Sequence, residues 1–230
     1  MNFIERIVES VKNAFSDLIS EISSRFREWK IRQEINKEKR KYAGYLISSE
    51  IQYVPEEPDK LLALQVVSFL NERFPNGIEA KLQEISVEER KDLLCQVVEE
   101  AEKIFEIEPV NFEIKHPSDI KEFLELGCGS YNKAKNLLCL NGSFVESESI
   151  ELVEEQIYTI IHELKHARQY SAIEEEKDYG YSEETIIDWR YNAIVYIRQE
   201  ECDEAYRKQA LENDAFGFEN YVRELFTANN

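Results

Sequence analysis

Two of the three histidines in this 230-residue chain lie four residues apart, with a glutamate directly after the first. His162, Glu163 and His166 thus form the pattern H-E-x-x-H. In a helix, residues i and i+4 lie on one face about one turn apart, so both imidazoles can reach the same ion. Zinc accepts neutral histidine nitrogen, and the neighbouring glutamate can take a proton from a zinc-bound water. The pattern therefore predicts a catalytic Zn²⁺ site for amide hydrolysis.

The residues around this motif have the spacing of an amphipathic helix from about residue 149 to residue 170. The segment contains no proline or glycine, and its apolar residues follow at steps of three and four, namely Ile150, Val153, Ile157, Ile160, Leu164 and Ala167. Such a stripe predicts a helix with one buried face. His162 and His166 fall on the face opposite Leu164, so we expect the core on one side and the metal on the other.

A catalytic zinc site needs a third protein ligand, and no third histidine follows the motif closely. We favour Glu212, because it stands beside a second helical stripe and one turn before the small residue Ala215, which would let two helices approach closely. Glu201 and Glu204 are the alternatives, although they belong to a denser acidic run that is typical of a solvated surface. Cys202 is a further, less favoured ligand.

At these residues a resemblance to a known family emerges. The stretch 162–169, followed by the stretch 212–218, resembles the minimal zincin domains of ImmA/IrrE-like peptidases. The resemblance implies a zincin fold over about residues 105–226, zinc held by two histidines and Glu212, and a strand within 126–141 beside the cleft. The chain departs from the family pattern in its long insertion between the two motif helices, and in Asp214-Ala215 where Ala-Asn is more usual.

The predicted activity is that of a zinc metallopeptidase acting on a protein or peptide substrate. Glu163 would take a proton from the metal-activated water and pass it to the leaving amine. A donor to the oxyanion is also needed, and Tyr170, Tyr191 and Tyr206 are candidates. Asp214 is our candidate for orienting a ligating histidine. The competing hypothesis is a non-enzymatic protein-binding module whose zinc site is structural or decayed.

Composition restricts the other function classes. A net charge of −19 argues against broad nucleic-acid binding, which relies on basic surface. No apolar run is long enough for a membrane span, and charges near the N-terminus argue against a secretory signal. The four cysteines are scattered without close pairing, which favours reduced thiols. We therefore expect a cytoplasmic protein.

The N-terminal region reads as one long amphipathic helix. Apolar residues recur at steps of three and four from Ile4 to Trp29, and no glycine or proline occurs before Gly44. Because a lone amphipathic helix must bury its stripe, this arm is expected to self-associate, to hold a partner protein or to pack on the body. A basic run at residues 25–41 could dock on an acidic surface or be solvated. We place a helical arm at residues 1–57 and the zincin-like domain at residues 58–230.

The remaining patterns predict a mostly α fold with a small sheet. Helices are expected near residues 59–74, from a capping box at Ser86 and Glu89, and over residues 182–203. Alternating residues at 110–114 and an apolar run at 137–140 predict two strands.

Overall fold

The structure, a computed structural model, describes residues 3–116 and 127–228, and it describes side chains from residue 24 onward apart from Phe26. The chain is mostly helical with a small three-stranded mixed sheet, as the sequence predicts. In chain order the elements are α1 (Phe3–Ser48), α2 (Glu57–Arg73), α3 (Ile78–Gln83), α4 (Val87–Phe105), β1 (Asn111–Lys115), β2 (Gly129–Asn132), the 3₁₀ turn η2 (Lys133–Lys135), β3 (Leu137–Asn141), α5 (Gly142–Val145), α6 (Ile150–Glu174), α7 (Glu183–Ile194), α8 (Asp203–Lys208) and α9 (Ala210–Thr227).

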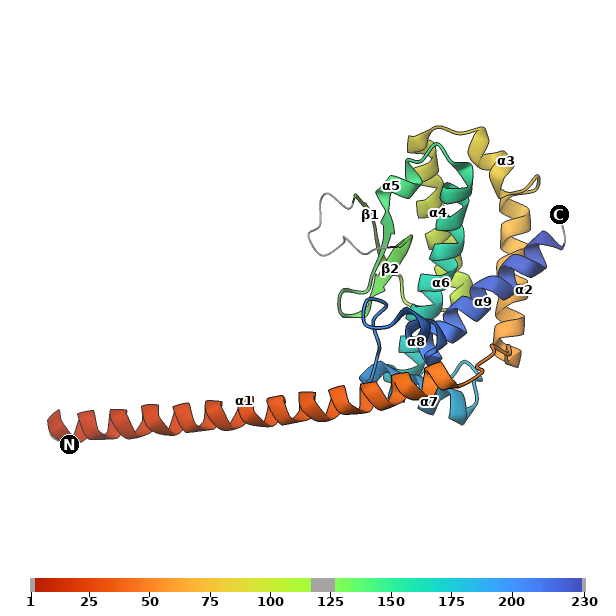
Figure 1. Ribbon diagram of the computed structural model, residues 1–230. Coiled ribbons are helices and arrows are strands. Elements are labelled where there is room, and N and C mark those ends of the chain that lie inside the picture. Colours follow the sequence, from red (N-terminus) through yellow and green to blue (C-terminus); the bar gives the residue numbers. More distant parts are fainter. Residues whose placement is uncertain (1–2, 117–126, 229–230) are drawn as a thin grey trace.

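The sheet has the order β1-β3-β2, with β3 parallel to β1 and antiparallel to β2. The strands predicted at 110–114 and 137–140 are confirmed to within one residue as β1 and β3. The short strand β2 forms one edge of the sheet and lies beside α6 (Figure 1). This edge strand therefore runs along the helix that carries the H-E-x-x-H motif.

The main hydrophobic core surrounds α6, which packs against α3, α4, α9 and the sheet. Its apolar stripe at Val153, Ile157, Ile160 and Leu164 is fully buried, as predicted. The predicted capping box also forms: the Glu89 carboxylate accepts the backbone N–H of Ser86 at 2.8 Å, and Ser86 Oγ accepts the N–H of Glu89 at 3.3 Å. This cap fixes the start of α4 against the core.

The last turns of the long helix α1 pack against the body, while its N-terminal end runs far from the other helices (Figure 1). Leu46 is buried against Ile197 and Ala205, and Lys39 Nζ lies 2.8 Å from Glu201 Oε2. The apolar stripe from Ile4 to Ile22 lies outside the described side chains. The division at residue 57 stays a prediction, with the end of α1 already part of the packed body.

The helix predicted over residues 182–203 is interrupted, and this expectation is wrong. α7 ends at Ile194 and α8 begins at Asp203. The buried side chain of Gln209 bonds both backbone groups of Ile197, accepting its N–H at 2.9 Å and donating to its carbonyl at 2.7 Å. Because these bonds replace helical ones, the helix can end here without leaving the buried N–H and C=O groups of Ile197 unbonded.

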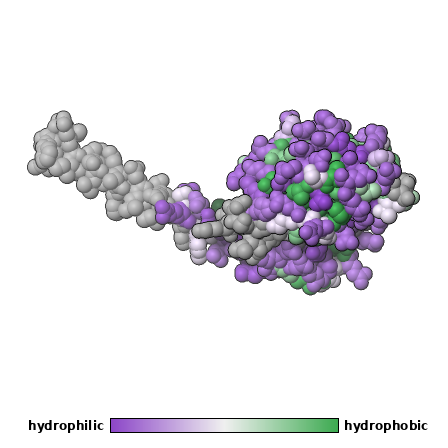
Figure 2. Space-filling view, turned by 90° about the horizontal axis from the view of Figure 1, so that it is seen from above, coloured by the Kyte–Doolittle hydropathy of each residue, from purple (hydrophilic) through white to green (hydrophobic). Residues whose placement is uncertain are grey.

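The visible face of the body is mostly hydrophilic (Figure 2), in keeping with the strongly acidic composition. Within the described residues, no helix has the length and apolar character that crossing a membrane requires. The four cysteines form no disulfide in the described structure.

Candidate metal centre

Helix α6 is buried almost all round from Gln156 to Ile173, with Tyr170 half-buried. Its polar side chains are therefore enclosed by neighbouring helices rather than facing open solvent. Buried ionisable groups are costly unless they are paired or bind a ligand. Most of these polar residues have a partner, although neither side-chain polar atom of Gln156 has one in the described structure. Two clusters of partners involve the motif, one at His162 and His166 and one at Lys165.

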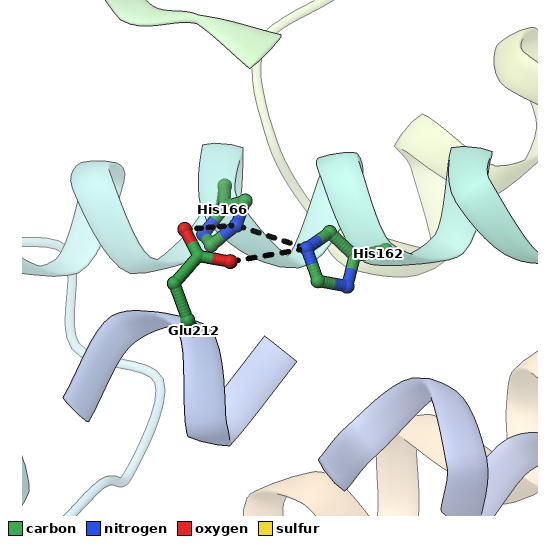
Figure 3. Close-up of side chains that lie close together, drawn as sticks. All are labelled: His162, His166 and Glu212. Carbon is green, nitrogen blue, oxygen red and sulfur yellow. Dashed lines mark hydrogen bonds and ion pairs between the residues drawn. The ribbon is translucent and has the colours of Figure 1, made fainter. Parts of the chain in front are cut away.

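The first cluster brings together His162, His166 and Glu212 (Figure 3). The two histidines project from α6, and Glu212 reaches them from the first turn of α9. The Nε2 atoms of the histidines are 3.2 Å apart, and the two oxygens of Glu212 lie 3.5 Å from His162 and 3.4 Å from His166. One ligand atom from each residue falls within 4.8 Å of the others, so the group could hold a metal ion.

The alternative third ligands do not join this group. Glu201 is exposed and pairs with Lys39, and Glu204 pairs with Lys208 at 2.9 Å on the surface. Cys202 packs near Leu46, against the end of α1. Among the carboxylates weighed from the sequence, Glu212 is thus the one placed beside both histidines.

The cluster carries strong mutual electrostatics in the absence of an ion. Burial disfavours the charged form of His162, but its contacts with Glu212 and Glu219 outweigh burial and raise its pKa to about 10. Burial likewise disfavours the charged form of Glu212, yet the two histidines hold its pKa well below the usual range. The buried site therefore favours protonated histidines beside an ionised Glu212. A divalent ion can take the place of the protons on the histidines.

A buried oxygen without a hydrogen bond also fits an ion at this position. Within the described part of the chain, Oε2 of Glu212 has no hydrogen-bond partner, and Nε2 of His162 lies 3.5 Å from it, at ion-pair distance. The other oxygen, Oε1, accepts a hydrogen bond from the hydroxyl of Tyr196 at 2.5 Å. Buried polar atoms without partners are rare and call for an explanation such as an absent ligand. Two imidazoles and one carboxylate are the donor set of catalytic zinc sites.

Gln169 fixes the orientation of His166, a role that the sequence did not identify. Its amide nitrogen donates to the carbonyl of Leu211 at 3.0 Å and to Asp214 Oδ2 at 2.6 Å. Its amide oxygen therefore faces Nδ1 of His166, 2.8 Å away, and can only accept a hydrogen bond from it. With Nδ1 protonated, Nε2 is the nitrogen that faces the cluster. Asp214, our candidate for this role, acts one step further out, through Gln169.

Glu219 is the corresponding partner of His162. Its carboxylate oxygen lies 3.3 Å from Nδ1 of His162, and Arg223 donates to the same carboxylate at 2.9 Å. Glu219 follows Glu212 by seven residues, two helical turns, and this spacing was the available signal in the sequence. Carboxylate partners of this kind orient a ligating histidine and raise its basicity.

The three candidate tyrosines lie at different places. Tyr206 lines the cleft beside the motif, and burial together with Glu212 and Glu163 raises its pKa. Tyr170 faces Tyr131 of β2, and Tyr191 is exposed against Tyr42 of α1. Tyr196, which the sequence analysis did not single out, makes the closest phenolic contact with the cluster.

Glu163 lies at the boundary between the cluster and a cleft of about 300 Å³. The carboxylate is 7% exposed, and burial raises its pKa, while the nearby histidines and the backbone N–H of Tyr131 counteract part of that rise. His162, Tyr206 and Phe216 line the same cleft. A carboxylate at the edge of a cleft, beside a buried group that could hold a metal ion, is placed to accept and release protons.

The close approach of β2 to α6 depends on a glycine. A Cβ on Gly129 would lie 2.7 Å from a Thr159 methyl group and 2.8 Å from the carbonyl oxygen of Cys139, so a side chain does not fit there. Gly129 also lines the cleft. The outer edge of β2, which pairs with no other described strand, is thereby held next to Glu163.

The second cluster on α6 is centred on Lys165, a variable position of the motif. Its side chain is completely buried, and Nζ donates to Asp59 at 2.5 Å and to the hydroxyl of Tyr181 at 2.9 Å. Asp214 lies 3.1 Å from the same ammonium group. This cluster joins α2, α6 and α9, and nothing in the local sequence pattern identifies it.

Comparison with known proteins found no matching protein-family model, no matching curated protein and no matching solved structure. The assignment of function accordingly depends on the residues and geometry described above.

Proposed function

We propose that this chain is a zinc-dependent peptidase that uses Glu163 as its general base. The observation that carries the proposal is the convergence of His162, His166 and Glu212 in a buried group whose neighbour, Glu163, opens onto a cleft. Zinc is the ion favoured by two imidazoles and a carboxylate. Bound zinc supplies a Lewis acid and lowers the pKa of its water towards neutrality.

The chain's own residues supply the remaining steps. Glu163 would accept the proton of the attacking water and deliver it to the departing amine, because it lies beside the histidines and lines the cleft that a substrate would enter. Gln169 holds His166 in one tautomer through a hydrogen bond, and the Glu219 carboxylate, 3.3 Å from Nδ1 of His162, favours a proton on that nitrogen. Tyr206 is the candidate donor to the oxyanion, because it lines the same cleft as Glu163.

The edge strand β2 supports a peptide as the substrate class. An extended peptide can add to a free strand edge through its backbone and can reach the cleft in that position. Two residues of this strand lie at the site: the backbone N–H of Tyr131 bonds Glu163, and Gly129 lines the same cleft as His162 and Glu163. The protein substrate itself is to be identified by experiment.

The test compares unchanged protein with Glu163→Gln, using zinc content and cleavage of a fluorogenic peptide library as the two readouts. Glu163→Gln should retain zinc and lose at least about a hundredfold in cleavage rate, the scale of a lost general base. Glu151→Gln is the matched control, because Glu151 is exposed on the same helix. This variant should cleave at the rate of unchanged protein. Equal cleavage by Glu163→Gln and the control would contradict the proposal and favour a non-enzymatic binding module.

A further inference from the structure

A second cavity, of about 440 Å³, lies between the end of α1, residues 49–56, α7 and the start of α9. It shares no lining residue with the cleft at Glu163. Its volume falls in the range of small-molecule binding pockets. Six aromatic side chains line it, namely Tyr42, Tyr45, Tyr53, Tyr181, Trp189 and Tyr191.

The cavity also carries an excess of negative charge. Four carboxylates line it, those of Glu56, Asp59, Asp188 and Asp214, against the single ammonium group of Lys208. Lys208 is already engaged by Glu204 at 2.9 Å and by the carbonyl of Ser49 at 3.2 Å. Lys165, which does not line the cavity, forms ion pairs with two of the four carboxylates, those of Asp59 and Asp214. Among the described residues, this leaves Glu56 and Asp188 without an ion-pair partner, and Glu56 already accepts hydrogen bonds from the backbone N–H and the hydroxyl of Ser182 at 2.9 and 3.1 Å.

The protein already binds one ammonium group with this chemistry. Nζ of Lys165 is hydrogen-bonded to Asp59 and Tyr181, and it lies 4.7 Å from the centre of the Tyr181 ring and 5.4 Å from that of Trp189. Carboxylate acceptors and aromatic faces together stabilise a desolvated ammonium ion. Asp59, Tyr181 and Trp189 are occupied by Lys165 and form the inner wall of the cavity, so a second ammonium group would use the remaining carboxylates and the tyrosines at the rim.

Access to the cavity comes from the surface. Tyr45 is 62% exposed and Tyr191 is 42% exposed, although both are large aromatic side chains. Exposed aromatic groups gathered at a cavity mark binding sites. We propose that this cavity binds a primary ammonium group, carried either by a small organic amine or by a lysine side chain of a peptide. This inference is independent of the proposed peptidase activity.

Calorimetric titration of the full-length protein tests the inference with two pairs of probes. The free-amine arm compares 1,5-diaminopentane with its neutral match, 1,5-pentanediol. The lysine arm compares Nα-acetyl-lysine amide with Nα-acetyl-norleucine amide. We expect at least one cation to bind tighter than its neutral match by fivefold or more, and the tighter of the two cations identifies the source. If neither cation exceeds its neutral match, the inference is wrong.

Two rim variants locate the binding in this cavity. Tyr191→Leu should weaken the cation by about two- to thirtyfold, the range of a cation–π contact. Asp188→Asn should weaken it by about two- to fivefold, as expected for a solvated ion pair. Asp92→Asn is the matched control, because Asp92 is exposed on α4 and does not line the cavity. If both rim variants bind the cation as tightly as the control variant does, the amine binds elsewhere and the inference is wrong.

Discussion

The two polar clusters on α6 are built from similar residues but differ in how completely their atoms are partnered. In the Lys165 cluster, the ammonium group bonds Asp59 and Tyr181, and Asp59 also accepts from Tyr53 at 3.1 Å. In the histidine cluster, Oε2 of Glu212 is buried without a hydrogen-bond partner in the described structure. In the Lys165 cluster, the charged groups bond one another and join three helices. In the histidine cluster, one atom of each residue points towards a common position that a metal ion could take.

This difference separates a structural role from a binding role. Both clusters are buried, so burial alone does not distinguish them. Charged groups that are fully satisfied by protein partners hold elements in register, and removing one partner leaves a buried charge. A group with a vacant acceptor and converging donors can take up a ligand with little rearrangement. Substituting one residue of each cluster tests whether the two clusters have these different roles.

The largest effect is expected for metal retention in His166→Ala. Losing one of three ligands removes a bond that no neighbour replaces, so zinc affinity should fall by well over a hundredfold, more than the loss of an orienting partner. Zinc content after dialysis, measured by elemental mass spectrometry, should drop from about one per chain to near zero. Full zinc occupancy in this variant would refute the site as described. Circular dichroism should show a folded protein, because the histidine cluster is not what joins the helices.

The next effect is on stability, in Lys165→Met. Removing the buried ammonium leaves Asp59 and Asp214 without their cation, and breaking such a pair costs about 3–5 kcal/mol of unfolding free energy. Denaturant unfolding measures this loss. Lys103→Met is the control: Lys103 is 69% exposed and pairs with Glu100, so its loss should leave stability unchanged within error. If both variants unfold at the same denaturant concentration, the Lys165 cluster does not have the structural role assigned to it.

A smaller effect is expected when only the orientation of a histidine is disturbed. Glu219→Gln keeps the shape of the side chain but removes the charge beside Nδ1 of His162. Zinc affinity should fall by about ten- to a hundredfold, the usual cost of losing such a partner. Competition with a chelator of known affinity measures the change. An affinity equal to that of unchanged protein would show that Glu219 serves Arg223 rather than the histidine.

The sequence was sufficient for those parts of the site that depend on local periodicity. The helix of the motif, its buried stripe and the placement of Glu212 beside a second stripe all follow from steps of three and four residues. The capping box at Ser86 was equally readable, because both of its partners are close in sequence. The zincin assignment, the peptidase activity and the identity of the ion stay predictions.

The parts that the sequence did not reveal depend on contacts between distant segments. Lys165 meets Asp59 across 106 residues, and Tyr196 reaches Glu212 from an irregular segment after α7. That segment is irregular because Gln209 replaces helical hydrogen bonds at Ile197, a contact that depends on how α9 folds back. Periodicity carries no information on such pairings, so the polar interior of α6 could not be assigned its partners in advance.

The smallest effect, and the one whose sign is least obvious, concerns Gly217 in α9. Glycine inside a helix usually costs about 1 kcal/mol relative to alanine, so Gly→Ala should stabilise. At Gly217, however, an added Cβ would overlap Cβ and Cγ of Tyr53, atoms near the backbone that cannot swing away. Overpacking of this kind costs about 1–3 kcal/mol, and it exceeds the gain in helix propensity.

Gly217→Ala should therefore lower the unfolding free energy, and it should do so by displacing Tyr53 from Asp59 and thus loosening the Lys165 cluster. Gly44→Ala provides the matched control in α1, where an added Cβ meets nothing within 4 Å. Gly44→Ala should leave the melting temperature unchanged or raise it, whereas Gly217→Ala should lower it. Because the overlap is on the Lys165 side of α6, zinc content should stay at about one per chain in both variants. A Gly217→Ala protein that melts higher than unchanged protein would show that the segment around Tyr53 yields, and that the Lys165 cluster is less rigid than its contacts imply.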